Sequence, residues 1–205
     1  MNKVIDFLTN TLKLSNNDII VIGNSSGPDS MALCYILEQI RKEKKFSLIC
    51  AHVNHNLRKE SKEEEKFLEQ YCKKHDIVFE HMTIEKYGDD NFHNEARKIR
   101  YNFFDEIIKK YNANYLMTAH HGDDLMETIL MRISRGSSLK GYAGFSQIVD
   151  KGTYKLVRPL IYATKLEIEQ FDKKNNIKFF VDQSNFKPKY TRNRYRKNVL
   201  PFLKE

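Results

Sequence analysis

The stretch IIVIGNSSGPDSMALCYIL, residues 19–37, contains the pattern that decides the fold. Its first four residues are β-branched and apolar, which favours a buried strand. Small residues follow at 23–27, and from Pro28 apolar residues recur at helical spacing. A strand, a small-residue turn and a helix can present backbone N–H groups to an anion at the helix N-terminus. The stretch therefore predicts an anion cradle, in which Asp29 is unexpected because its carboxylate repels phosphate.

Short β-type runs alternate with helical patterns on either side of this stretch. Strands are predicted at 19–22, 47–54, 77–84 and 115–119, and helices at 28–42, 61–74, 91–111 and 123–134. Such alternation implies right-handed crossovers and a parallel sheet with helices on both faces. The predicted fold class is therefore α/β, a doubly wound parallel sheet of Rossmann-like type, with its core in about residues 1–135.

The pattern changes after residue 135. A small-residue loop at 136–144 is followed by a predicted hairpin of residues 145–148 and 154–157. Helices are predicted at 164–175 and 191–203, and the last of these is strongly basic. We expect one domain over 1–205, in which residues 136–205 form a C-terminal helical and basic extension.

Composition and charge narrow the classes of partner. The chain has 205 residues and a formal net charge of +8, which indicates either a solvated basic surface or a polyanionic partner such as nucleic acid. The three cysteines are isolated in apolar patterns, which is typical of buried free thiols in a reducing cytosol. The N-terminus lacks the apolar region of a secretory signal, and no run approaches the roughly 20 apolar residues of a membrane span. We therefore expect a cytoplasmic protein with no membrane contact.

Polar clusters follow three of the predicted strands, at residues 24–30, 52–58 and 118–128. In open α/β sheets, ligands bind at the carboxyl ends of the strands. The first cluster has neither the Gly-Lys-Ser/Thr of a Walker A loop nor the G-x-G-x-x-G dinucleotide pattern. Its serines and Gly27 could hold phosphate, with Asp29 as a ligand for an accompanying cation. The alternative is that Asp29 only stabilises the start of the helix.

The cluster HHGDDLMET, residues 120–128, places Asp123 or Asp124 on one helical face with Glu127, because residues three and four apart are neighbours. Carboxylates with histidines suit zinc or iron, or Mg²⁺ with a nucleotide, and the nearby Asp29 favours Mg²⁺. The alternative is that the two histidines only cap the strand.

Two basic stretches complete the candidate site. Arg97 and Arg100 lie one turn apart on the predicted helix 91–111, where a solvated face is the usual explanation. The segment KPKYTRNRYRK, residues 187–197, interleaves six basic residues with two tyrosines. That pattern suits a grip on a phosphate backbone with stacking platforms, or else a solvated tail.

Taken together, these stretches resemble the PP-loop (N-type) ATP pyrophosphatases, whose signature S-G-G-x-D-S stands here as SSGPDS, residues 25–30. Within that superfamily the chain is similar to the tRNA(Ile)-lysidine synthetase family. The resemblance runs from about residue 19 to the C-terminus and is carried by HVNHNLRKESKEEE (52–65), NEARKIRYNFF (94–104), TAHHGDDLMETILMRISRGSSLKGYAGF (118–145), RPLIYATKLEI (158–168) and DQSNFKPKYTRNRYRKNVLP (182–201).

The resemblance implies ATP-dependent ligation of free L-lysine to the wobble cytidine of a tRNA(Ile) with a CAU anticodon. The reaction passes through an adenylated cytidine and gives lysidine, AMP and pyrophosphate, with ATP as substrate and Mg²⁺ as the cation. Two alternatives are another PP-loop tRNA-modifying enzyme, a thiolase, and a catalytically impaired nucleotide- or RNA-binding module. A homodimer is also expected as a possible assembly.

The resemblance also implies roles for individual residues. The catalytic set is Asp29, Arg100, His120, Asp124, Glu127, Arg192 and Arg196. The ATP-binding set is Ser25, Ser26, Gly27, Pro28, Asp29, Ser30 and His52. Lysine is expected at Asp124 and Glu127, Mg²⁺ at Asp29 and Asp124, and tRNA at Lys189, Arg194 and Lys197.

Two residues depart from the family pattern. Ser26 stands where the signature has its first glycine, and adds a Cβ where backbone approaches phosphate. Ser138 stands where the family loop R-G-x-G has its second glycine. Family members usually continue into further tRNA-binding domains, so we expect these 205 residues to be a minimal version or a piece of such a protein.

Overall fold

The computed structural model describes residues 1–56, 60–85, 87–88, 92–181 and 191–204. The strands are β1 (Ile19–Gly23), β2 (Ser47–Asn54), β3 (Val78–Thr83), β4 (Tyr115–Thr118), β5 (Ile148–Asp150) and β6 (Lys155–Val157). The α-helices are α1 (Asn2–Asp6), α2 (Pro28–Lys44), α3 (Ser61–Lys74), α4 (Phe92–Tyr111), α5 (Gly122–Arg135), α6 (Leu139–Tyr142), α7 (Lys165–Lys174), α8 (Thr191–Asn198) and α9 (Leu200–Leu203). A π-helical turn, η1 (Phe7–Thr11), and a 3-10 turn, η2 (Pro159–Tyr162), complete the elements.

Within the described residues the strands form one sheet in the order β3-β2-β1-β4-β6-β5. The first four pairings are parallel, and only β5 runs antiparallel, beside β6. The parallel strands are short and apolar, as expected for strands covered on both faces. The doubly wound α/β fold predicted from the sequence is confirmed.

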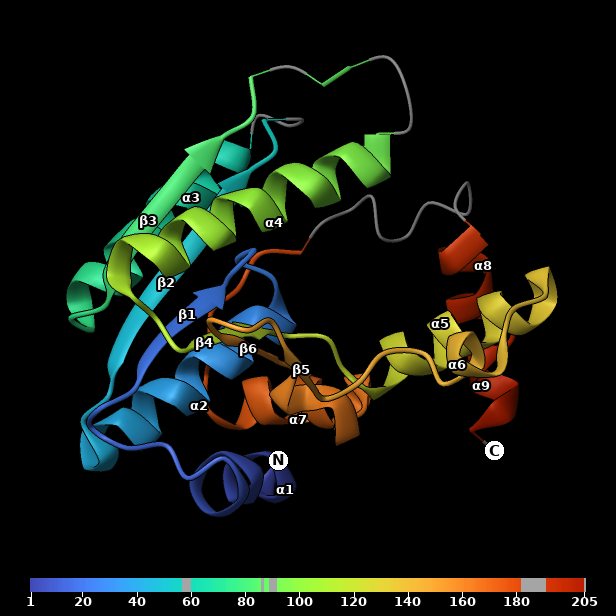
Figure 1. Cartoon of the computed structure of the whole chain (residues 1–205), viewed down its shortest axis with the longest axis horizontal. Helices are drawn as coiled ribbons and strands as arrows, with labels where there is room; N and C mark the ends of the chain where they lie inside the picture. The colour runs from blue at the N-terminus through green and yellow to red at the C-terminus, as the bar shows by residue number, and fades with distance from the viewer. Residues whose placement is uncertain (57–59, 86, 89–91, 182–190, 205) are drawn as a thin grey trace.

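Helices cover both faces of the sheet (Figure 1). On one face α4 packs Phe103, Phe104 and Ile107 against Val21 and Leu116 of the central strands. On the other face α1, α2 and α7 bury a second apolar cluster, which includes the alternate strand residues, Ile20 and Ile22 of β1 among them. The three thiols, Cys34, Cys50 and Cys72, are free and buried in this second cluster, as predicted.

Gly23 shows how closely α4 approaches the sheet. A Cβ at Gly23 would lie 2.7 Å from Cζ of Phe104, which is too close for any real side chain. The last residue of β1 is therefore a glycine because the Phe104 ring occupies the space of a side chain.

The predicted strands and helices between residues 19 and 135 agree with the structure to within about two residues at each end. Two predictions beyond residue 135 were wrong. The first hairpin strand is Ile148–Asp150 rather than 145–148, because the preceding residues pack against other elements: the Phe145 ring contacts the ring of His120 and the guanidinium of Arg158. The last helix is broken into α8 and α9 at Val199, just ahead of Pro201, whose ring is incompatible with a continuing helix.

Helices α5, α6, α8 and α9 form a lobe beyond the sheet (Figure 1), in which α8 packs on α5 and α9 packs on both. Within the described part of the chain, no helix is long and apolar enough to cross a bilayer.

Candidate active site

The central strands β1 and β4 are neighbours, and their connections go to opposite faces of the sheet. Helix α2 follows β1 on one face, whereas α4 precedes β4 on the other. This reversal is the point at which doubly wound sheets bind ligands. The loop after β1 (residues 24–27) and the loop after β4 (residues 119–121) both lie there.

The loop after β1 is held by its own polar side chains. The N–H of Ser26 donates to Oδ1 of Asn24 at 2.9 Å, and the N–H of Ser25 donates to Oγ of Ser30 at 3.2 Å. The Ser30 hydroxyl donates in turn to the carbonyl of Gly27 at 2.9 Å. Pro28 begins α2, so the helix N-terminus faces the loop. The loop is thus preorganised in the way that an anion cradle requires.

Ser26 carries the unusual backbone conformation of this loop. Its φ is +61°, in the left-handed region that costs an L-residue free energy and costs glycine little. The residue is fully buried, its hydroxyl donates to the carbonyl of Ser25, and its own carbonyl accepts from the N–H of Phe180 at 2.9 Å. The substitution seen in the sequence therefore falls at a position whose backbone geometry suits glycine.

Asp29 is already paired with a positively charged side chain. The ammonium of Lys165, from the first turn of α7, donates to its Oδ1 at 2.5 Å. The Nε2 of His121 lies 3.8 Å from its other carboxylate oxygen. Asp29 is thus placed to neutralise a cation at the N-terminus of α2, which a helix-start role alone would not require.

The residues present could bind Mg²⁺ only if a nucleotide supplied some of its ligands through phosphate oxygens. Among the residues described, no group of three or more His, Cys, Asp or Glu side chains could hold a metal. Mg²⁺ accompanying a nucleotide needs only one or two carboxylates besides phosphate oxygens and water. Asp29 meets this requirement, because its carboxylate already binds one cation, the ammonium of Lys165.

The loop after β4 orients two histidines differently. The Nδ1 of His120 lies 2.9 Å from the hydroxyl of Thr118, and its ring meets Phe145 edge-on at 5.5 Å. Burial, helped by the charges of Arg158, Arg100 and Arg192, lowers the pKa of His120 to about 4, although the charge of Asp124 acts to raise it. His120 is therefore neutral near pH 7.

His121 caps the start of α5. Its backbone N–H donates to Oδ2 of Asp124 at 3.2 Å, and its Nε2 lies 3.4 Å from the same oxygen. Burial acts to raise the pKa of Asp124, but the charges of His121 and Arg192 outweigh it and hold the pKa below its usual value. Asp124 is therefore ionised.

Glu127 is the most buried acid of the site, with a fully buried side chain between two arginines of α8. Arg192 donates from Nε to Oε2 at 2.6 Å, and Arg196 donates from Nε to Oε1 at 2.6 Å. Both guanidinium groups also reach Oδ1 of Asp124, at 3.6 Å and 3.3 Å. The two acids predicted to bind lysine are thus engaged by two positive side chains of the chain itself.

Arg100 belongs to helix α4 and His52 to strand β2. The charge of Arg100, on α4, lowers the pKa of His120, and burial lowers the pKa of Arg100 itself. His52, on β2, is buried, with Nδ1 2.9 Å from the carbonyl of Asn24. Its contact is therefore with the backbone that leads into the β1 loop.

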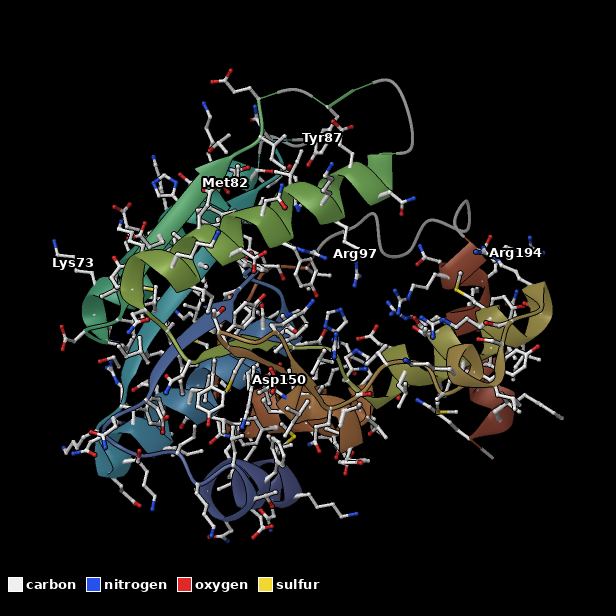
Figure 2. The ribbon with its side chains drawn as sticks, in the orientation of Figure 1. Lys73, Met82, Tyr87, Arg97, Asp150 and Arg194 are labelled. Atoms are coloured by element: carbon white, nitrogen blue, oxygen red, sulfur yellow. The ribbon has the colours of Figure 1, made fainter. Side chains whose placement is uncertain are left out.

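The residues predicted to bind tRNA are less completely placed. Arg194 and Lys197 are exposed on α8, whereas Lys189 lies outside the described residues. Figure 2 shows Arg194 on α8 and Arg97 projecting from α4.

Sequence reasoning missed Lys165 and gave His121 no role of its own. Lys165 lies in the stretch RPLIYATKLEI, but it is 136 residues from Asp29 along the chain. The one signal for Lys165 was its place at the start of a helix that follows the last strand pair, because such a helix begins near the carboxyl ends of the strands.

A model of the PP-loop domain family matches residues 2–203. Proteins named tRNA(Ile)-lysidine synthase from Bacillus cereus and Bacillus subtilis are 44% and 40% identical to this chain over 212 and 211 residues. Each of these alignments covers 100% of this chain and 44% of the relative. A protein of the same name from Staphylococcus aureus is 40% identical over 193 residues, covering 92% of this chain and 45% of its own. The chain thus spans less than half the length of these relatives.

Two solved structures share the fold. A U34-tRNA thiolase from Methanococcus maripaludis, with its 4Fe-4S cluster, has a TM-score of 0.74 at 20% identity, covering 87% of this chain and 63% of its own. An NH3-dependent NAD synthetase from Campylobacter jejuni has a TM-score of 0.57 at 16% identity, covering 86% of this chain and 72% of its own. At such identities these likenesses concern the fold alone.

Proposed function

This chain belongs to the PP-loop domain family, and from that premise we propose that it uses ATP to join free lysine to the wobble cytidine of a tRNA(Ile) with a CAU anticodon. The relatives that align with the whole chain carry the name of that activity. The observation that carries the proposal is the meeting of the β1 loop, its cation-bearing Asp29 and the α5 acids at one edge of the sheet.

The chemistry requires charge stabilisation more than covalent help. A cytidine ring carbonyl is a poor electrophile, so its oxygen first attacks the α-phosphorus of ATP and pyrophosphate leaves. The lysine ε-amine then attacks the ring carbon, loses a proton, and AMP leaves with the carbonyl oxygen. Both steps move negative charge onto phosphate oxygens, where fixed donors and cations are most effective.

Residues 25–30 would hold the ATP phosphates, with His52 supporting the loop through Asn24. Asp29 and Asp124 would hold Mg²⁺, which supplies positive charge to the phosphates when bound. His120, neutral near pH 7, could accept a proton close to the α-phosphate, and Arg100 would stabilise the developing charge.

Asp124 and Glu127 would recognise the lysine ammonium. Because Arg192 and Arg196 now occupy these carboxylates, an incoming ammonium would have to share them with a guanidinium or displace it. The released arginine would then be free to close over the substrate phosphates.

ATP and tRNA are cytoplasmic, which is the compartment that the proposal assigns. The homodimer stays a prediction.

Incubation with labelled lysine, ATP and a CAU-anticodon tRNA(Ile) tests the proposal. Label should enter the tRNA with release of AMP, and a methionine tRNA should take up none. RNA binding without AMP release would instead favour a non-catalytic module, and would contradict the proposal.

Arg100 provides a sharper test of the site. Arg100→Ala should slow single-turnover lysidine formation by at least about 100-fold, the loss seen when one charge-stabilising donor is removed. The matched control is Arg97→Ala, because Arg97 lies one turn away, with its guanidinium over the Tyr101 ring at 5.0 Å. Full turnover in Arg100→Ala would remove Arg100 from the catalytic set.

The alternative of sulfur transfer has less support. All three cysteines lie in the apolar core, and burial raises the pKa of Cys34. A thiol so placed is a poor nucleophile, because the reactive form is the thiolate.

A further inference from the structure

Asp172 on α7 is a buried acid that the proposed chemistry does not use. It is only 1% exposed, and neither carboxylate oxygen has a hydrogen-bond partner among the described residues. A buried carboxylate without a partner costs considerable free energy, so such a group calls for an explanation. Burial raises the pKa of Asp172 to about 7; Lys165 acts to lower this pKa, and Asp29 and Glu169 to raise it.

Asp172 lies on the same face of α7 as Lys165. The two residues are seven positions apart, which is two turns and about 10 Å along the helix axis. The Asp172 side chain leans toward the N-terminus of the helix, that is, toward Lys165, and the charge of Lys165 acts on the Asp172 carboxyl group. Helix α7 packs on α2, which carries Asp29, so both acids act on the same ammonium.

Two carboxylates therefore compete for one ammonium. In this structure Lys165 donates to Asp29 at 2.5 Å and leaves Asp172 without a partner. A divalent cation at Asp29 would repel the ammonium from that carboxylate, and the unpaired acid two turns along α7 would then attract it.

We propose that Asp172 is a positioning residue, the alternative partner that receives Lys165 when the cation accompanying ATP occupies Asp29. The inference rests on the proposed function, because it requires a cation-nucleotide complex at the β1 loop. Asp172 makes the exchange possible, because it offers the displaced ammonium a buried carboxylate in place of Asp29. The Lys165 ammonium thus has two alternative acid partners, and in this structure it binds Asp29 and leaves Asp172 unpaired.

The test is the Mg²⁺ dependence of binding of AMPCPP, a non-hydrolysable ATP analogue, by Asp172→Asn and Asp172→Ala. The Mg²⁺ concentration that gives half-maximal binding should rise roughly tenfold in both variants, within the usual range of coupling between sites. Their unfolding temperatures should equal or exceed that of the wild type, since an unpaired buried charge has been removed. Glu43→Gln, an exposed acid in the last turn of α2 and so far from Asp29 at the start of that helix, is the matched control and should leave the Mg²⁺ midpoint unchanged.

Lys165→Gln identifies the route of the effect. In that background the ammonium is gone, so adding Asp172→Asn should move the Mg²⁺ midpoint by less than about twofold, as expected for uncoupled positions. An unshifted midpoint in the single Asp172 variants would overturn the inference, and so would an equal shift with and without Lys165. Absence of AMPCPP binding by the wild-type chain would contradict the proposed function as well, whereas wild-type binding with unshifted variants would overturn this inference alone.

Discussion

Ser26 combines a strained backbone conformation with a fully buried side chain. Its φ of +61° favours glycine, but its hydroxyl also donates to the carbonyl of Ser25. Ser26→Gly relieves the backbone strain, but it loses the hydrogen bond of the hydroxyl and gives the unfolded chain more conformational freedom. Because these effects oppose one another, the free energy of unfolding should change by less than about 1 kcal/mol. If the Cβ crowds the phosphates, the variant should bind ATP more tightly than the wild type in a direct titration.

Ser26→Ala is the control, because it loses the hydroxyl and keeps the Cβ. It should bind ATP no more tightly than the wild type and should be less stable in urea unfolding by about 1 kcal/mol, the typical contribution of one hydrogen bond. Equal ATP affinity in Ser26→Gly and Ser26→Ala would show that the Cβ does not hinder nucleotide binding.

His120 should make stability depend on pH. In the unfolded chain it takes up a proton near pH 6.5, but in the folded protein only near pH 4. Between these pH values the unfolded state binds more protons, so the free energy of unfolding falls as pH falls from 6.5 to 4, by on the order of 3 kcal/mol. His120→Gln should flatten the pH profile of urea unfolding in this window, and a profile as steep as that of the wild type would contradict a half-buried histidine that is neutral in the folded protein.

Some of the residue-level site could be predicted from the sequence, because its signals are local. The loop after β1 and the acids one turn apart on α5 are patterns within a few residues. The roles of Lys165 and Asp172 could not be predicted, because Asp29, which Lys165 contacts, lies more than 130 residues earlier and is brought near α7 only by the packing of α7 on α2.

At the scale of elements, α8 is attached to α5 chiefly through Glu127. This acid is fully buried, while the side chains of its partners Arg192 and Arg196 are each 42% exposed. Glu127→Ala should therefore cost about 3 kcal/mol in the free energy of unfolding, at the low end for breaking a buried ion pair because water screens the guanidinium groups.

The same variant should loosen α8 before the sheet unfolds. Limited trypsin digestion should cut at Arg192–Lys197 much faster in Glu127→Ala than in the wild type, because the basic helix has lost its anchor. The control is Glu106→Gln on α4, an exposed acid, which should leave the digestion pattern unchanged. Equal cutting rates in both variants would show that apolar contacts, rather than the ion pairs, hold α8.

Elements with a periodic apolar pattern were predicted well, and those governed by tertiary contacts were not. Helix α3 was predicted at its observed bounds, and its first turn is acidic, as a helix N-terminus favours. The strand β5 has only three residues and one buried neighbour strand, so its position depends on pairing with β6 and not on its own sequence.

At the scale of the whole molecule, the chain carries a net charge of +8, and its last described helices add positive charge beside the site. A basic molecule binds tRNA partly by releasing counterions, so affinity should fall as salt rises. Each phosphate contact contributes a slope of about 0.7 to 0.9 in a plot of log K against log salt concentration.

Arg194 and Lys197 should account for part of that slope. Both are exposed on α8, and the structure pairs neither with an acid among the described residues. Changing both to Gln should lower tRNA affinity and reduce the salt slope by about 1 to 2, while ATP affinity stays unchanged. Filter binding over a range of salt concentrations measures both quantities.

The matched control changes Lys44 and Lys74 to Gln. These exposed residues end α2 and α3, and because both helices run antiparallel to the strands that they follow, they lie at the edge of the sheet opposite the site. The two double variants have the same net charge, so net charge alone predicts equal effects on tRNA binding, whereas a tRNA surface on α8 predicts a loss of slope only in the Arg194 and Lys197 variant. Equal loss in both would mean that tRNA is attracted by the field of the whole molecule without contacting α8.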